Sequence, residues 1–123
     1  MIAVTACEKP APKVTVTSNG RVINVDAAHY CRGTTCTDDA DSTKAITIRS
    51  DSLISFDVPK RVAEHGWQLS LGDQRLFEKP RTKSHYTMSI PVAPGTATVP
   101  VTVTQGSGAQ PEGVWTLQLL LRD

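Results

Sequence analysis

KVTVTSNGRVINV, residues 13–25, decides the fold class of this chain. Apolar and polar residues alternate on both sides of Asn19-Gly20, a dipeptide that suits a two-residue hairpin turn. Because successive side chains of a strand point to opposite faces, the apolar residues of each arm would share one face. The segment therefore predicts a β-hairpin with one apolar and one polar side.

The same alternation continues along most of the chain, with turn residues at intervals of about 8–12 residues, as in β-sandwiches. One or two helical turns are expected at 59–65, with Pro59 at the start and Gly66 at the stop. We predict an all-β, immunoglobulin-like antiparallel β-sandwich of seven to nine short strands, with Trp67 and Trp115 in its core. The further strands are expected at 45–49, 53–58, 67–71, 86–90, 99–103 and 113–121.

Two stretches depart from regular strand patterning. Residues 26–44 are polar and predict a long loop, or a strand end pinned by a disulfide. Pro100 interrupts the strand expected at 99–103. Because proline has no backbone N–H, it indicates an edge position or a bulge.

Length and composition indicate one ordinary globular domain. The chain has 123 residues, 20% of them charged, and a net charge of +1. Such a balance gives no electrostatic reason to expect a nucleic acid partner. No apolar run approaches the roughly 20 residues of a transmembrane helix.

The N-terminal segment has the form of a lipobox. Val4-Thr-Ala-Cys7 places an aliphatic residue and two small residues before a cysteine, whose sulfur would accept a diacylglyceryl group. We expect residues 1–6 to be the truncated end of a signal peptide, residues 7–13 a lipidated, Pro-rich spacer, and residues 14–123 one β-sandwich domain. The alternative is a cytosolic protein that begins at Met1.

The chain contains three cysteines, at positions 7, 31 and 36. Lipidation of Cys7 would leave Cys31 and Cys36 as an even pair, for which we predict a disulfide worth about 2 kcal/mol. An oxidised pair fits a compartment outside the cytoplasm. Two free thiols, or a metal site of His29, Cys31 and Cys36, are the alternatives. Zinc sites usually have a second ligand pair elsewhere, whereas His65 and His85 stand alone.

Other candidate chemistry is weaker. Ser84 and His85 are neighbours and would point to opposite faces of a strand, as would His85 and Met88. The acidic run at 38–41 offers oxygen ligands for Ca²⁺ but lacks the Gly and Glu positions of an EF-hand. The basic run at 79–83 could meet an anionic lipid or polymer. For both runs a solvated loop is the preferred interpretation.

Several features of the sequence together form a familiar pattern. They are the early Val/Thr strand, the Cys31/Cys36 pair, and the segments Ala6-Cys7-Glu-Lys-Pro10, Ile54-Ser-Phe-Asp-Val-Pro59, Val62-Ala-x-x-Gly66-Trp67 and Gly113-Val-Trp115. In these features the chain resembles a group of actinobacterial lipoproteins catalogued only as a domain of unknown function. The resemblance implies an exported lipoprotein with a β-sandwich. It carries over no catalytic or binding residues.

We therefore expect a non-catalytic binding or interaction module, anchored through lipid on Cys7 to the outer face of the cell membrane. An envelope protein or a cell-wall polymer would be its partner, contacted through loops that include the Cys31–Cys36 loop. We expect no catalytic residues, no metal and no cofactor. The alternative is an extracytoplasmic metal-handling protein that uses His29, Cys31 and Cys36; an enzyme ranks third.

Overall fold

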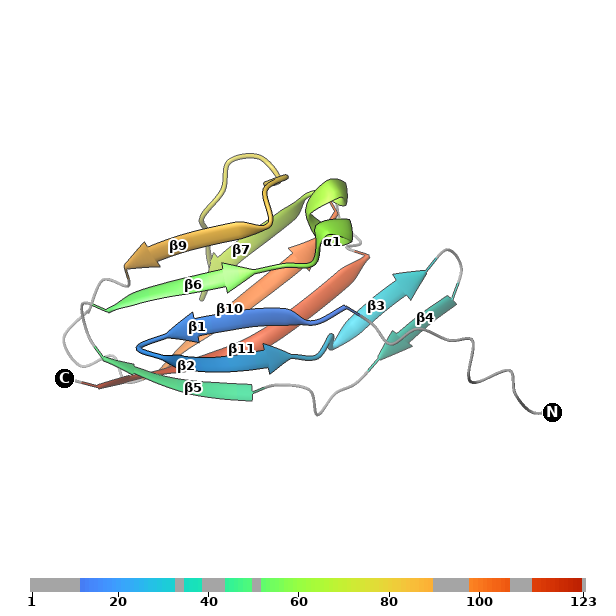
Figure 1. The fold of residues 1–123 in the computed structure, drawn as a ribbon. Coiled ribbons are helices and arrows are strands. Elements are labelled where there is room, and N and C mark those ends of the chain that lie inside the picture. Colours follow the sequence, from blue (N-terminus) through green and yellow to red (C-terminus); the bar gives the residue numbers. More distant parts are fainter. Residues whose placement is uncertain are drawn as a thin grey trace.

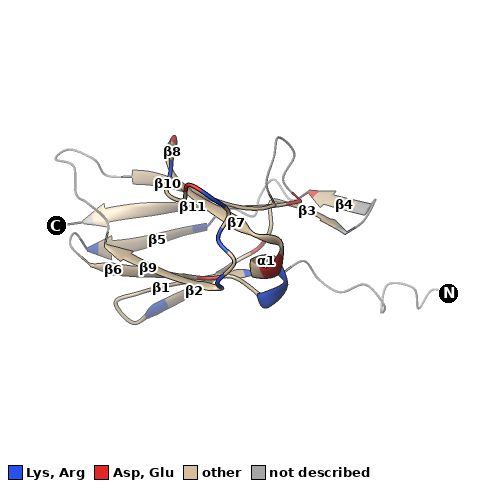
Figure 2. Ribbon diagram, turned by 90° about the horizontal axis from the view of Figure 1, so that it is seen from above, with Lys and Arg blue, Asp and Glu red and all other residues tan. Residues whose placement is uncertain are grey.

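The computed structural model describes residues 12–32, 35–38, 44–49, 52–89, 98–106 and 112–122. Over these residues eleven strands form two sheets that face each other (Figure 1). Figure 2 shows the two layers from above, with α1 (Lys60–His65) at one end. The predicted all-β sandwich is confirmed, with more strands than the seven to nine expected.

The first layer is a four-stranded antiparallel sheet with the order β2-β1-β6-β9. Its β1–β2 hairpin turns at Asn19 and Gly20, whose positive φ angles of 52° and 78° suit the tight turn predicted from the sequence. Val14 pairs with Val25 across this hairpin. The strands are β1 (Val14–Ser18), β2 (Arg21–Val25), β6 (Leu53–Asp57) and β9 (His85–Ser89).

The second layer has seven strands in the order β4-β3-β11-β10-β7-β8, with β5 also paired to β11. One edge of β11 is shared: β3 pairs with its first two residues, and β5 runs parallel to residues 117–122. This parallel pair is the departure from the antiparallel pattern. The strands are β3 (His29–Arg32), β4 (Thr35–Asp38), β5 (Lys44–Arg49), β7 (Trp67–Leu71), β8 (Gln74–Arg75), β10 (Thr98–Gln105) and β11 (Gly113–Arg122).

The core lies between the layers and contains both tryptophans, each fully buried. Their indole N–H groups donate to backbone carbonyls, Trp67 to Lys83 and Trp115 to Pro12, so that neither is left unpaired. The short helix α1, predicted from Pro59 and Gly66, adds its buried Val62 and Ala63 to the core. Among the described residues, no helix is long and apolar enough to cross a membrane.

Two local expectations need correction. For the stretch 26–44 the long loop is wrong: its described part contains the strands β3 and β4, joined by the Cys31–Cys36 disulfide, which is nearer to the other alternative, a strand end pinned by a disulfide. β10 is an interior strand, so Pro100 is not on an edge strand. Proline is tolerated there because the pairing of β10 with β7 ends at Val101, and the Pro100 carbonyl accepts from Gly72 N–H at 2.8 Å.

Candidate functional site

The β3–β4 hairpin carries the cysteines. Cys31 and Cys36 are paired directly across its two strands and form a disulfide, as predicted. The alternation of side chains along β3 turns Cys31 away from the core and the neighbouring Tyr30 into it. Cys31 is half-buried and Cys36 is exposed, so solvent reaches the sulfur pair.

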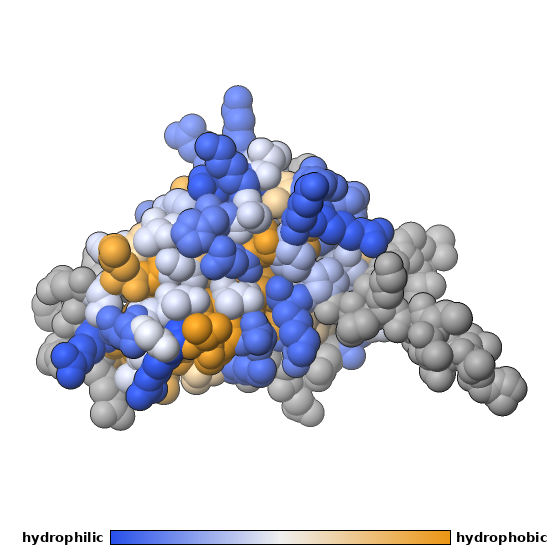
Figure 3. All heavy atoms as spheres, viewed as in Figure 1, coloured by the Kyte–Doolittle hydropathy of each residue, from blue (hydrophilic) through white to orange (hydrophobic). Residues whose placement is uncertain are grey.

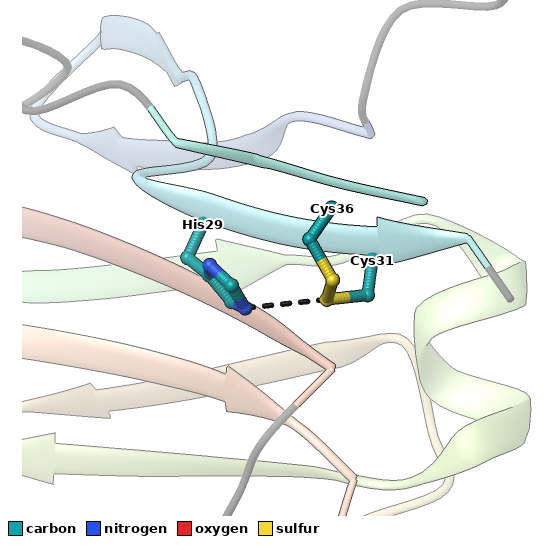
Figure 4. Close-up of side chains that lie close together, drawn as sticks. All are labelled: His29, Cys31 and Cys36. Atoms are coloured by element: carbon teal, nitrogen blue, oxygen red, sulfur yellow. Dashed lines mark hydrogen bonds between the residues drawn. A yellow bond between two sulfur atoms is a disulfide. The ribbon is translucent and has the colours of Figure 1, made fainter. Parts of the chain in front are cut away.

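His29 lies on the same face of the hairpin as the disulfide (Figure 4). Its Nε2 is 3.3 Å from the Sγ of Cys31, two residues further along β3. Its other ring nitrogen, Nδ1, is 2.5 Å from Oδ1 of Asp38, which is the cross-strand partner of His29. The hairpin register therefore gathers four polar side chains, of which Asp38 was expected only as part of a solvated acidic run.

This geometry assigns a role to each nitrogen of the imidazole. With Asp38 Oδ1 as the acceptor, Nδ1 donates its hydrogen to this contact, which leaves the Nε2 lone pair facing the sulfurs. One ligand atom each from His29, Cys31 and Cys36 lie within 4.8 Å of one another. In the disulfide the sulfurs are not thiolates, and a thiolate is the form that binds metal. In this oxidised state the cluster is a disulfide with an oriented imidazole.

Tyr30 joins the hairpin to the core. Its side chain is 4% exposed, and its ring centroid lies 6.0 Å from that of Trp115 on β11. Backbone bonds from Ala28 N–H to Val114 O and from Cys31 N–H to Glu112 O, both 2.7 Å, complete the attachment. The cluster is thus carried on a strand whose opposite side is firmly packed.

Trp115 also fixes the start of the described chain. Its Nε1–H donates to the Pro12 carbonyl at 2.9 Å, and Lys13 Nζ lies 3.4 Å from Asp26 Oδ1. The described chain therefore starts at the end of the sandwich where β1 begins, which is also the end that carries the β3–β4 hairpin (Figure 1). Cys7, the predicted lipidation site, lies outside the described residues.

A second polar group crosses the outer face of the four-stranded sheet. His85 Nδ1 is 2.6 Å from Asp57 Oδ1, and its Nε2 is 2.8 Å from Thr87 Oγ1, which is 2.9 Å from Ser55 Oγ. This network of side chains was not predicted from the sequence, where His85 was paired only with its near neighbours Ser84 and Met88. The cross-strand register is the signal that joins Asp57 to His85.

The acid–imidazole–hydroxyl order resembles the arrangement that activates a nucleophile, but its surroundings differ. The side chains of Asp57 and His85 are 45% and 58% exposed. Catalytic electrostatics depend on a site from which water is excluded. This face is mostly hydrophilic, with apolar residues in small separate patches (Figure 3). The network therefore serves best as a set of cross-strand contacts.

The remaining sequence candidates are placed as follows. Met88 packs against the core while His85 is exposed, as strand alternation predicts. The basic run at 79–83 lies in a largely exposed loop, as expected, in which Arg81 stacks 5.0 Å from the ring centroid of Tyr86 and pairs by its backbone with Trp67. Of the acidic run, only Asp38 lies within the described residues. His65 Nδ1 is 3.9 Å from Glu112 Oε2, far in sequence from the disulfide.

Comparison with curated proteins gives no match. Comparison with protein families matches residues 7–119 to the family described as "Protein of unknown function (DUF2771)". The match begins at Cys7 and includes both sheets, the disulfide hairpin and most of β11. The chain therefore belongs to the DUF2771 family.

Proposed function

We propose that this protein is a non-catalytic binding or interaction module, anchored by lipid on Cys7 to the outer face of the cell membrane. The observation that carries the proposal is the coincidence of Val4-Thr-Ala-Cys7 with the start of the family region at residue 7. Lipoprotein maturation cuts before the lipidated cysteine, so a shared region that begins there is what an anchored family would have.

The disulfide supports an extracytoplasmic location. Stable protein disulfides form in oxidising compartments and are rare in the cytosol. With Cys31 and Cys36 paired, Cys7 is the one cysteine of the sequence that remains for lipidation. A mature lipoprotein cysteine carries at least two acyl chains, enough for stable attachment.

The attachment point would also orient the domain. Cys7 is five residues from Pro12, and a fully extended chain of that length spans about 18 Å. Because Trp115 holds the Pro12 carbonyl, the hairpin end of the sandwich would face the membrane. The Asn19-Gly20 turn, at the other end of β1, would face outward toward an envelope protein or a cell-wall polymer.

The anchor is tested by expressing the gene with its upstream region in the native host, with a clickable fatty acid in the medium. We expect the label on the wild-type protein and its partition into the detergent phase. Cys7→Ser should lose both properties and be released to the medium. The Cys31→Ser/Cys36→Ser variant retains Cys7 and should keep the label. An unlabelled wild-type protein found among cytosolic proteins would refute the proposal.

A further inference from the structure

We propose that the β3–β4 hairpin is a redox-gated metal site: reduction of the Cys31–Cys36 disulfide creates a binding site for a thiophilic divalent cation, with zinc as the best fit. Its ligands are the two cysteine thiolates and Nε2 of His29. Asp38 acts as a positioning residue through His29. This inference concerns the hairpin alone and does not depend on the lipid anchor.

The backbone ladder already places the ligands. Cys31 pairs with Cys36 and His29 pairs with Asp38 in the same antiparallel register, so the two strands remain side by side without the disulfide. Tetrahedral zinc, with bonds of about 2.3 Å to sulfur and 2.0–2.1 Å to nitrogen, sets its ligand atoms roughly 3.5–3.8 Å apart. Nε2 of His29 is 3.3 Å from Cys31 Sγ, and all three ligand atoms lie within 4.8 Å. Once the disulfide is broken, rotation of the Cys31 and Cys36 side chains would bring the two sulfurs to the separation that tetrahedral zinc requires.

Asp38 supplies what a metal-bound histidine commonly has, a carboxylate on its other ring nitrogen. This contact orients the ring and leaves Nε2 toward the sulfurs. His85 and Asp57 make the same pair at 2.6 Å on the other sheet, and there the other ring nitrogen, Nε2, lies 2.8 Å from the Thr87 hydroxyl oxygen instead of a sulfur. The His85–Asp57 pair is thus a matched control for the His29–Asp38 pair, with the Thr87 hydroxyl beside the ring where the hairpin has the Cys31 sulfur.

The site is accessible to both reactants. The His29 side chain is 34% exposed, and Cys36 is exposed, so an ion and a reductant can approach from solvent. Three protein ligands leave the fourth position of a tetrahedral ion for water or another small ligand. The arrangement suits reversible binding better than a closed structural site.

The chemistry balances with a dithiol as the reductant. The dithiol gives two electrons and two protons to the Cys31–Cys36 bond, which breaks into two thiols as a disulfide forms in the reductant. Binding of Zn²⁺ then displaces the two thiol protons to solvent. Oxidation by another disulfide reverses the electron transfer, re-forms the Cys31–Cys36 bond and releases the ion.

The test uses the full chain with Cys7→Ser, so that the N-terminal thiol cannot act as a ligand. The protein is reduced with a phosphine, which is removed under nitrogen, and titrated with Co²⁺. Thiolate-to-cobalt charge transfer and d–d absorption report sulfur ligation and tetrahedral geometry. Zn²⁺ is then added to displace the cobalt. Far-UV circular dichroism checks that each sample remains folded.

We expect one Co²⁺ per reduced chain, with thiolate bands that Zn²⁺ abolishes, and no such bands from the oxidised chain. His29→Gln and Asp38→Asn should each weaken binding by about 10–100-fold, and Asp38→Asn should leave the thiolate bands in place. His85→Gln should bind as the parent does. The Cys31→Ser/Cys36→Ser variant should give no thiolate bands.

Equal cobalt binding by the reduced and oxidised chains would overturn the proposal. So would a folded, reduced chain without thiolate bands; if such a chain exchanges rapidly with disulfides, the hairpin is a dithiol–disulfide site instead. Equal effects of His29→Gln and His85→Gln would also exclude His29 as a ligand. Because Cys7 is absent from every sample, none of these outcomes bears on lipidation.

Discussion

Substitution of Gly113 by alanine should destabilise the protein strongly, because the two aromatic rings that join the hairpin to the core leave no space there. A Cβ on Gly113 would lie 2.6 Å from Cη2 and 2.8 Å from Cζ3 of Trp115, and 3.0 Å from Cδ1 of Tyr30. Trp115 is fully buried and Tyr30 is 4% exposed, so neither ring can swing into solvent without opening the core.

The magnitude follows from the clash. Overpacking of a well-packed core costs about 1–3 kcal/mol, and contacts this short with two rings place Gly113→Ala in the upper part of that range. For a domain of this size each kcal/mol lowers the melting temperature by about 4 °C. A loss of about 2–3 kcal/mol therefore predicts a melting temperature lower by about 8–12 °C.

A double-mutant cycle separates the clash from other effects. Trp115→Phe removes the part of the indole ring that the new methyl group would strike, so in that background Gly113→Ala should cost at least about 1 kcal/mol less. Gly20→Ala is the control: its φ is +78° and no atom lies within 4 Å of the added Cβ. Its cost of about 1–2 kcal/mol comes from the backbone and should be equal in both backgrounds.

The assay is thermal and urea unfolding followed by far-UV circular dichroism, with the disulfide intact in every sample. Tryptophan fluorescence is unsuitable because one variant removes a tryptophan. The reasoning fails if Gly113→Ala changes stability by less than about 0.5 kcal/mol, the range of ordinary surface substitutions. It fails equally if the penalty is unchanged when residue 115 is phenylalanine.

Three further outcomes are expected. Trp115→Phe removes the indole N–H that donates to the Pro12 carbonyl, so tryptic cleavage after Lys13, followed by mass spectrometry, should be about 5- to 30-fold faster. This factor corresponds to a loss of about 1–2 kcal/mol. An unchanged rate would mean that this hydrogen bond does not hold the chain around Pro12. Gln105 is 1% exposed, and its Oε1 has no hydrogen-bond partner in the described part of the chain. Gln105→Met should therefore leave the urea midpoint unchanged or raise the free energy of unfolding by up to about 1 kcal/mol. A clear loss of stability would show that this amide oxygen has a hydrogen-bond partner in solution. His85→Gln removes an exposed contact between His85 and Asp57 and should change the free energy of unfolding by less than about 1 kcal/mol. A larger loss would give the surface network a structural importance that its exposure does not suggest.

The fold class could be predicted because the strands are amphipathic. Alternation correctly placed Trp67 and Trp115 in the core, and the Asn-Gly turn fixed the first hairpin. Pro59 and Gly66 correctly bounded the helix because their backbone restrictions are local. Features that depend on two or three neighbouring residues could therefore be predicted from the sequence.

Pairing between distant strands could not be predicted in the same way. The parallel contact of β5 with β11 joins residues about 70 positions apart, and no local pattern specifies it. The partnership of His85 with Asp57 needs the β6–β9 register, and that of His29 with Asp38 needs the β3–β4 register. The candidate residues at 29, 31 and 36 were found from spacing, but Asp38 required the structure.

The β3 strand explains how a redox change could leave the fold intact. Its side chains alternate between the two faces of the sheet. Tyr30 faces inward and packs on Trp115, whereas His29 and Cys31 face outward toward Cys36 and Asp38. Breaking the disulfide alters one face, while the core contact and the two backbone bonds of Ala28 and Cys31 belong to the other side and to the strand itself. A hairpin held only by its disulfide would unravel on reduction and scatter its ligands. This hairpin has an independent attachment, and for that reason its reduced state can retain the geometry that a metal ion requires.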